Sequence, residues 1–118
     1  MGSRVNPKVL ALGRLKSGVR NTLEAAYELE LEEQKQRGEI LWYQFEGITF
    51  KLAKDTRYTP DFVVMLPNGE IECRETKGFW RDDAKMKIKV ASALFPFRFV
   101  ALYALPKKLG GGFRREEF

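Results

Sequence analysis

The chain has 118 residues, of which 44% are apolar and 13% aromatic, so it is long enough for one domain with a hydrophobic core and too short for two. Lys and Arg number 21 against 16 Asp and Glu, and the resulting net charge of +5 favours a polyanionic partner. The absence of His excludes His-ligated metal sites and Ser-His-Asp catalysis, and the lone Cys73 excludes an intramolecular disulfide and a multi-Cys zinc site.

The first twenty residues are predicted to form a basic arm. They contain no acid and five basic side chains, which are Arg4, Lys8, Arg14, Lys16 and Arg20. Residues 24–46 are acidic by contrast, with seven Glu against Lys35 and Arg37. A basic terminus of this kind is either a solvated segment or a contact surface for nucleic acid. We therefore place the boundary of the folded domain after residue 20.

The first part of the domain is predicted to form a helix followed by a hairpin. Residues 21–37 carry apolar side chains at helical spacing among Glu and Gln, and Gly38 is expected to cap this helix at its C-terminus. Residues 40–45 and 48–52 are rich in β-branched and aromatic side chains, which predicts two paired strands joined at Glu46-Gly47. Three aromatic residues of the first strand are expected in the core: Trp42, Tyr43 and Phe45.

The second part is predicted to form another hairpin, a helix and a last strand. Residues 54–56 form the loop before the second hairpin, whose predicted strands are 58–66 and 70–77. Residues 82–94 return to helical spacing, and residues 97–104 alternate as a strand. Gly110-Gly111-Gly112 indicates that residues 105–118 form a flexible charged tail. The domain, residues 21–104, is therefore of the α/β class, with one helix, four strands, a second helix and a fifth strand.

The Pro67-Asn68-Gly69 turn fixes the register of the second hairpin. A two-residue Asn-Gly loop would put Pro67 in a hydrogen-bonded pair for which it has no N–H, so that loop is disfavoured. A three-residue loop suits the fixed φ of Pro67 and puts Gly69 where a left-handed residue is needed. With this loop Val63 pairs with Cys73, and Asp61 faces Glu75 two residues further along.

Asp61, Glu75 and Lys77 then meet at one end of the hairpin, because side chains two apart lie on one face of a strand. Two facing acids destabilise a sheet unless a cation compensates them. Mg²⁺ or Mn²⁺ fits, since hard cations prefer oxygen ligands, here Asp61, Glu75 and the carbonyl of Thr76. Lys77 would orient water and offset charge in the transition state. The alternative is purely structural: Asp61 caps a turn, and Glu75 forms an ion pair with Lys77.

Around these residues the sequence resembles the PD-(D/E)xK nuclease superfamily, and in it the small phage endonucleases that include Holliday-junction resolvases. The resemblance covers residues 14–104 and is carried by Lys16-Ser17-Gly18, Tyr58-Thr59-Pro60-Asp61-Phe62, Leu66-Pro67-Asn68-Gly69, Glu75-Thr76-Lys77-Gly78-Phe79-Trp80 and Asp82-Asp83. It implies a restriction-endonuclease-like αβββαβ core, in which a central mixed sheet is flanked by helices.

The resemblance also implies a further catalytic carboxylate on the first helix. Asn21-Thr22-Leu23-Glu24 is similar to the start of that helix in the related endonucleases, which favours Glu24 as a ligand of the metal. Glu28, one turn on, is the alternative. Read from the residues alone, Glu24 stabilises the helix dipole and can close a capping box with Asn21.

Basic residues flank the expected site on both sides and are candidates for contacting DNA phosphates. They are Arg14, Lys16, Arg20, Arg74, Arg81, Lys85, Lys87 and Lys89. Trp80 and Phe79 could stack on an unpaired base or anchor the loop against the core. Cys73 is expected to be a buried small side chain rather than a nucleophile.

The expected function is that of a Mg²⁺-dependent endodeoxyribonuclease that hydrolyses phosphodiester bonds in branched DNA and, by analogy with junction resolution, acts as a homodimer. The alternatives are a transposase-like or end-processing nuclease subunit, and a catalytically silent DNA-binding protein with the same fold. No secretory signal or apolar run of membrane-spanning length is visible. We therefore expect an intracellular protein, in the cytoplasm of a bacterial host if a phage encodes it.

Overall fold

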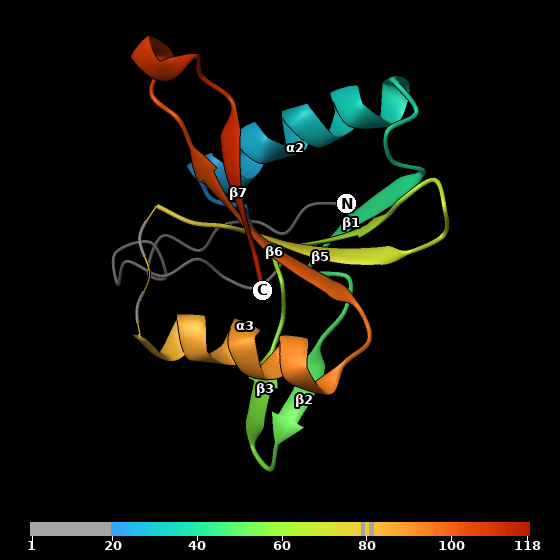
Figure 1. The fold of residues 1–118 in the computed structure, drawn as a ribbon, viewed down its shortest axis with the longest axis vertical. Helices are drawn as coiled ribbons and strands as arrows, with labels where there is room; N and C mark the ends of the chain where they lie inside the picture. The colour runs from blue at the N-terminus through green and yellow to red at the C-terminus, as the bar shows by residue number, and fades with distance from the viewer. Residues whose placement is uncertain (1–19, 79, 81) are drawn as a thin grey trace.

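A mixed five-stranded sheet lies between two α-helices in the computed structural model, which describes residues 20–78, 80 and 82–118 (Figure 1). The fold is α/β, as expected, and the strand order in the sheet is β1-β4-β5-β6-β7. The elements are α2 (Thr22–Gln36), β1 (Trp42–Phe45), β2 (Phe50–Ala53), β3 (Thr56–Tyr58), β4 (Phe62–Met65), β5 (Ile71–Thr76), α3 (Asp82–Leu94), β6 (Arg98–Ala104), the short 3-10 helix η1 (Lys107–Leu109) and β7 (Phe113–Glu117).

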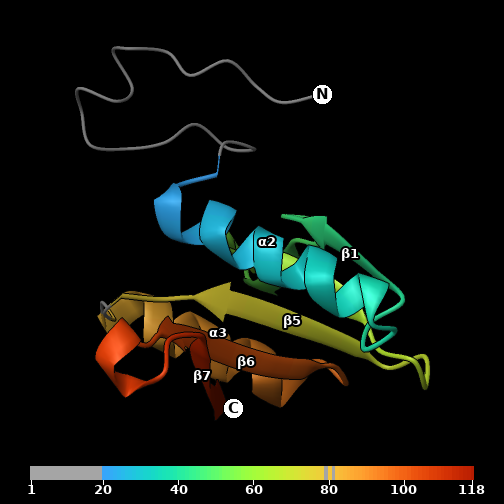
Figure 2. The same ribbon diagram turned by 90° about the horizontal axis from the view of Figure 1, so that it is seen from above.

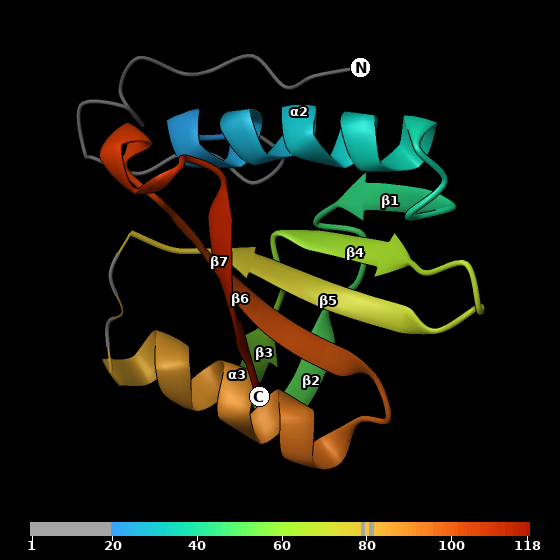
Figure 3. The ribbon, with the colours of Figure 1, turned by 45° about the horizontal axis from the view of Figure 1, so that its top comes forward.

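The two helices cover opposite faces of the sheet, as Figures 2 and 3 show. β5 and β6 are parallel, because the chain crosses between them through α3, and the other neighbouring pairs are antiparallel. No helix in the described part of the chain is long and apolar enough to cross a membrane.

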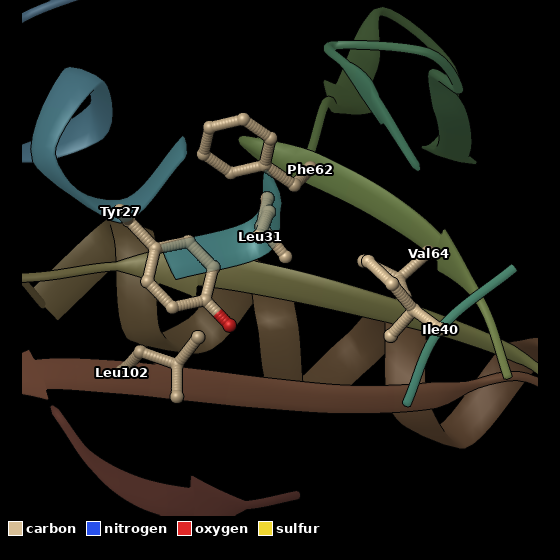
Figure 4. Packing of buried hydrophobic residues seen from close by; sticks show 6 residues of the cluster. All are labelled: Tyr27, Leu31, Ile40, Phe62, Val64 and Leu102. Carbon is tan, nitrogen blue, oxygen red and sulfur yellow. The ribbon is translucent and has the colours of Figure 1, made fainter. Parts of the chain in front are cut away.

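Each face of the sheet has its own hydrophobic cluster, since side chains alternate along the strands. Figure 4 shows the cluster under α2, where Tyr27 and Leu31 pack on Phe62, Val64 and other strand side chains. The cluster under α3 contains the following buried residues: Phe50, Tyr58, Cys73, Ile88, Ala91 and Phe99. The predicted burial of Cys73 is confirmed, and burial raises the pKa of its thiol to about 12.

α2 begins and ends close to the predicted residues. Asn21 and Glu24 form the capping box: the Glu24 amide donates to Oδ1 of Asn21 at 2.7 Å, and the Asn21 amide donates to Oε1 of Glu24 at 2.9 Å. Gly38 follows the helix with a left-handed φ of 76°, which glycine adopts without steric cost.

The β4–β5 hairpin has the register that the turn sequence predicts. Met65 pairs with Ile71, and Val63 pairs with Cys73. Gly69 has a left-handed φ of 89°, as the three-residue loop requires. The hairpin therefore ends where two carboxylates were expected to face each other.

The predicted hairpin of residues 40–52 is wrong, because β1 pairs with β4 and not with β2. Glu46 leaves β1 with a left-handed φ of 49°, and its amide still donates to the Asp61 carbonyl at 2.8 Å. Gly47 lies so close to the sheet that a Cβ would meet Cγ1 of Val63 at 2.7 Å. After β1, the edge strand, the chain thus continues into the separate β2–β3 sheet instead of turning back to pair β2 with β1.

β2 and β3 form a separate two-stranded sheet, so the predicted loop 54–56 and the predicted strand 58–66 both need correction. Thr56 already belongs to β3 and pairs with Ala53, which leaves Lys54 and Asp55 as the turn. Asp55 has a left-handed φ of 58°, a conformation that Asp tolerates better than most residues.

Residues 105–118, predicted to be a flexible tail, contain η1 and β7. β7 is antiparallel to β6, and Phe113 packs edge-on against Tyr27 with ring centroids 4.9 Å apart. Trp42, predicted to be in the core, is 40% exposed because it lies on the outermost strand. Tyr43 and Phe45 pack half-buried against the core.

Candidate active site

Asp61 and Glu75 lie together just beyond the last pair of the β4–β5 ladder. Phe62 and Arg74 form that pair, and the Asp61 amide donates to Oε1 of Glu75 at 3.3 Å. Both side chains are buried, with 8% of Asp61 and 7% of Glu75 exposed. The three-residue turn at the far end of the hairpin sets this geometry, because a register one residue different would bring Thr76 opposite Asp61.

Glu75 is held by a tyrosine and a lysine. Its Oε1 accepts a hydrogen bond from the Tyr58 hydroxyl at 2.9 Å, and its Oε2 lies 3.2 Å from Nζ of Lys77. Tyr58 comes from the end of β3, so the β2–β3 sheet contributes to the site. The ion pair of Glu75 with Lys77 was part of the structural alternative, and it coexists here with the approach of Asp61.

Asp61 is held from the other strand of the hairpin. Its Oδ2 accepts two hydrogen bonds from Thr76, one from the backbone amide and one from Oγ1, each at 2.9 Å. The predicted role of Thr76 was to offer its carbonyl. In this structure its amide and hydroxyl instead fix the orientation of the Asp61 carboxylate.

Glu24 is the helix carboxylate that reaches the site. Its carboxyl interacts electrostatically with that of Asp61, in addition to closing the capping box. Glu28 is used elsewhere, since it forms an ion pair with Arg20 and accepts a hydrogen bond from Tyr43 at 3.1 Å. The geometry thus favours Glu24 over Glu28 as the third carboxylate.

The three carboxylates hold protons more tightly than isolated ones. Burial, followed by the Asp61 charge, raises the pKa of Glu24 to about 8 and that of Glu75 to about 7. Burial also raises the pKa of Asp61, although hydrogen bonds from Thr76 oppose the increase. Lys77 and Tyr58 lower the pKa of Glu75 without cancelling the effect of burial. A cation among these groups would relieve this repulsion.

Oxygen ligands for a hard cation are available from Asp61, Glu75 and Glu24. Within the described ranges, however, no group of three or more His, Cys, Asp or Glu side chains is gathered closely enough to hold a metal ion. Protein donors occupy the carboxylate oxygens instead. Holding a cation would require the three carboxylates to come closer together, and each carboxylate oxygen has a second lone pair that could accept the cation while its hydrogen bond remains.

Trp80 supports Lys77, a contact that the sequence did not reveal. The Lys77 ammonium lies over the Trp80 ring at 5.1 Å from its centroid, and the indole N–H donates to the Tyr103 hydroxyl. On its other side Trp80 packs edge-on against Phe118, 5.9 Å between centroids. Trp80 is thus an anchor against the core, as predicted, and it also fixes the position of the site lysine.

The candidate DNA-contacting residues differ widely in their surroundings. Arg14, Lys16 and Arg81, and with them Phe79, lie outside the described residues. Arg20 is engaged by Glu28 and stacks over the Phe45 ring at 4.4 Å. On α3, Lys85 lies 3.7 Å from Glu116, Lys87 lines a groove beside the β2–β3 sheet, and Lys89 is exposed.

Arg74 does not contact DNA from its place in this fold, so that prediction is wrong. Only 4% of it is exposed, because its side chain points into the face under α2. Its Nε donates to Glu72 at 2.7 Å, and its Nη1 donates to Tyr27 at 2.9 Å and to Gln34 at 2.8 Å. Arg74 is therefore a structural residue that joins α2 to the sheet.

Glu72 is the buried partner that keeps Arg74 in place, and sequence reasoning missed it. It is 2% exposed and also accepts a hydrogen bond from Nη2 of Arg115 at 3.0 Å. Burial alone would raise the pKa of Glu72, but the bonds from Arg115 and Arg74 outweigh it and hold the pKa below its usual range. Arg115 comes from β7, so the signal is absent from the local sequence.

No protein-family model, curated protein or solved structure matches this chain.

Proposed function

We propose that the protein is a divalent-cation-dependent endodeoxyribonuclease. The observation that carries this proposal is the convergence of Asp61, Glu75 and Lys77, with the Glu24 carboxyl near enough to interact electrostatically with Asp61. Facing buried acids destabilise a fold, and a nearby lysine neutralises only part of their charge. The similarity of residues 58–83 to PD-(D/E)xK nucleases supports the same proposal and a restriction-endonuclease-like core.

Mg²⁺ or Mn²⁺ is the cofactor that fits these residues. Carboxylates are the ligands that hard divalent cations prefer, and burial first, then the Asp61 charge, raise the pKa values of Glu24 and Glu75, effects that a bound cation would offset. Asp61 and Glu75 would hold the cation, with Glu24 as a further ligand. When bound, the cation supplies Lewis-acid activation of the phosphodiester and stabilises its developing charge.

The residues around the carboxylates have separate tasks in this proposal. Lys77 is placed to orient an attacking water and to offset charge in the transition state. Thr76 and Tyr58 hold Asp61 and Glu75 in position through the hydrogen bonds described above. Trp80 restricts where the Lys77 ammonium can lie.

DNA is the proposed substrate, and branched DNA is its preferred form. The net charge of +5 supports a polyanionic substrate. The preference for junctions and a homodimeric state rest on the resemblance alone. Cleavage of a four-way junction, a fork, a nicked duplex and a linear duplex in one assay tests the preference, and equal rates on all four would contradict it.

Replacing Asp61 by Asn tests the activity itself. Asp61→Asn and Glu75→Gln should each abolish cleavage in Mg²⁺ and leave DNA binding in EDTA largely intact. Glu70→Gln is the matched control, because Glu70 is exposed at the other end of the same hairpin. Cleavage by Asp61→Asn at the wild-type rate would rule out this site.

A catalytically silent DNA-binding protein is the second candidate. The observation that favours it is the set of protein donors that already occupy the Asp61 and Glu75 oxygens in this structure. It predicts DNA binding that is the same in Mg²⁺ and in EDTA, with no cleavage in either. Any cleavage that appears with Mg²⁺ and disappears with EDTA excludes it.

A further inference from the structure

The β2–β3 sheet projects beyond α3 at one end of the molecule (Figure 1). It is a hairpin of two strands that are separate from the main sheet. Phe50, Leu52, Thr56 and Tyr58 point inward, where the first and last are buried and the other two line a groove of 260 Å³ against α3. The intervening side chains therefore point away from the body of the protein.

The outward face of this hairpin is basic. Lys51 and Arg57 are exposed and are direct partners across the two strands, and Lys54 is exposed in the turn beside Asp55. We refer to Lys51, Lys54 and Arg57 as the basic hairpin residues. Directly paired side chains in an antiparallel sheet have Cβ atoms roughly 5 Å apart, so two cations in these positions repel each other.

No acid in the described part of the chain forms an ion pair with any of the three basic hairpin residues. By contrast, Arg37 and Arg98, which also lie on the surface, each form ion pairs with Glu side chains. The repulsion between Lys51 and Arg57 thus destabilises the free protein slightly, and a bound external anion would reduce this repulsion.

The hairpin leads directly into the candidate active site. Tyr58, the residue after Arg57, donates its hydroxyl hydrogen bond to Glu75, and Asp61 follows three residues later. The turn at Asp55 is six residues from Asp61, so at about 3.3 Å per residue it lies within roughly 20 Å of the site. Duplex DNA carries one phosphate charge per roughly 1.7 Å of helix axis, so a bound duplex presents several phosphates over that distance.

Beyond Glu24, which lies at the candidate site, α2 would repel DNA. α2 carries five Glu and a single Lys, and it lies on the face of the sheet opposite α3 (Figure 3). A duplex that reaches Asp61 and Glu75 is therefore favoured to extend along the hairpin side rather than over α2.

We propose that the basic hairpin is a DNA-contacting arm, in which Lys51, Lys54 and Arg57 hold the phosphate backbone of duplex DNA next to the scissile bond. This inference rests on the proposed function for its substrate. It adds a specific docking surface, because none of the candidate contact residues named above, which precede α2 or lie on or near β5 and α3, belongs to this hairpin. A two-stranded ribbon is also narrow enough to enter the major groove.

The test compares two pairs of neutralising substitutions. Lys51→Gln/Arg57→Gln removes two charges from the arm, and Lys107→Gln/Lys108→Gln removes two exposed charges from η1, at the opposite end of the molecule in Figure 1. Binding of a labelled linear duplex in EDTA is measured between about 50 and 200 mM NaCl, where each phosphate contact contributes about 0.9 to the slope of log Kd against log salt.

The arm pair should lower that slope by roughly 1.8 and weaken binding, while the η1 pair leaves both unchanged. The melting temperature of the Lys51→Gln/Arg57→Gln variant should stay equal to that of the wild type or rise, because these substitutions remove the repulsion between the two cations. Equal slopes for the arm pair and the wild type would overturn the arm while leaving the nuclease proposal intact if Mg²⁺-dependent cleavage persists. A wild-type protein that neither binds nor cleaves DNA would overturn both.

Discussion

The amide of Asp61 donates a hydrogen bond to the side chain of Glu75 at 3.3 Å, so the backbone of one acidic residue fixes the carboxylate of the other. The Asp61 carboxylate is in turn fixed by the amide that follows Glu75, that of Thr76. The backbone of the hairpin therefore helps to position both acids, and the Thr76 hydroxyl adds a second bond to Asp61. Tyr58 and Lys77 complete the arrangement from outside the ladder.

The Tyr58 hydroxyl is expected to act as a positioning group for Glu75. Tyr58→Phe leaves Oε1 of Glu75 with the Asp61 amide as its remaining donor. We expect cleavage to fall by about 10–100-fold, in the range found for residues that orient metal ligands. The Mg²⁺ concentration needed for half-maximal rate should rise in parallel, which a purely structural role would not require.

Tyr43→Phe is the matched control for this substitution. The Tyr43 hydroxyl also donates to carboxylates, those of Glu28 and Glu32, which lie about one and two turns along α2 from Glu24. Its removal should leave both the cleavage rate and the Mg²⁺ requirement unchanged. Parallel losses in the two variants would indicate a general effect of tyrosine hydroxyls on stability.

Local turn chemistry explains why the centre of the site was predictable. Pro67 and Gly69 allow one loop length, and the loop length decides which residues face each other along the hairpin. The capping box of Asn21 and Glu24 was predictable for a similar reason, because Asn21 begins the helix three residues earlier, whereas the choice of Glu24 as a site residue rested on the resemblance. These features depend on residues close together in the sequence.

Pairings between distant segments were not predictable in the same way. The Glu46-Gly47 turn predicts that β1 pairs with β2, yet β1 pairs with β4. In this position Tyr43 and Phe45 of β1 pack against the cluster that contains Phe62. β7 has four charged residues in five and lacks an apolar alternation, so nothing local marks it as a strand. The burial of Arg74 depends on Glu72 and on Arg115 from β7, and an exposed arginine was the natural expectation without that strand.

The capping box of α2 predicts a stability effect at Asn21. Asn21→Ala removes the acceptor for the Glu24 amide and should destabilise the protein by about 1 kcal/mol. For a domain of this size the melting temperature should fall by roughly 4 °C. Asn21→Ser retains a capping oxygen and should stay within about 0.5 kcal/mol of the wild type in denaturant titration. Equal losses in both variants would show that the cap is not the cause.

Arg74 is expected to matter for stability and not for DNA binding. Arg74→Met leaves Glu72 buried with fewer donors and should cost about 3 kcal/mol, the lower end of the range for a broken buried pair, because Arg115 still contacts Glu72. Glu72→Gln/Arg74→Met should recover part of that loss. Urea unfolding measures both, and the salt dependence of DNA binding by the folded single variant should match that of the wild type.

Arg98→Met separates burial from charge in this experiment. Arg98 also approaches Glu72, at 3.5 Å, but its side chain is 46% exposed. Exposed ion pairs contribute at most about 1 kcal/mol, so this variant should be close to the wild type in stability. A loss as large as that of Arg74→Met would mean that the net charge around Glu72, and not the buried pair, stabilises the sheet.

The raised pKa values of the site carboxyls predict an unusual pH dependence of stability. Glu75 and Glu24 have pKa values of about 7 and about 8 in the folded protein, against an ordinary value of 4.5. Between pH 4.5 and about pH 8 the folded state therefore binds more protons than the unfolded chain, and its stability falls as the pH rises. The carboxyls with lowered pKa values, Glu72 among them, lose their contribution only in more acidic solution.

Thermal unfolding in EDTA should accordingly show a melting temperature that decreases as the pH is raised from about 5 to about 8. Mg²⁺ should restore more stability at the upper end of this range than at the lower end, because protons on Glu24 and Glu75 compete with the cation. Glu24→Gln should flatten the decrease in EDTA, since it removes the group with the higher pKa. A melting temperature that rises steadily across the same range would mean that burial and mutual repulsion do not control these carboxyls. A stabilisation by Mg²⁺ that is independent of pH would place the cation away from Asp61, Glu75 and Glu24.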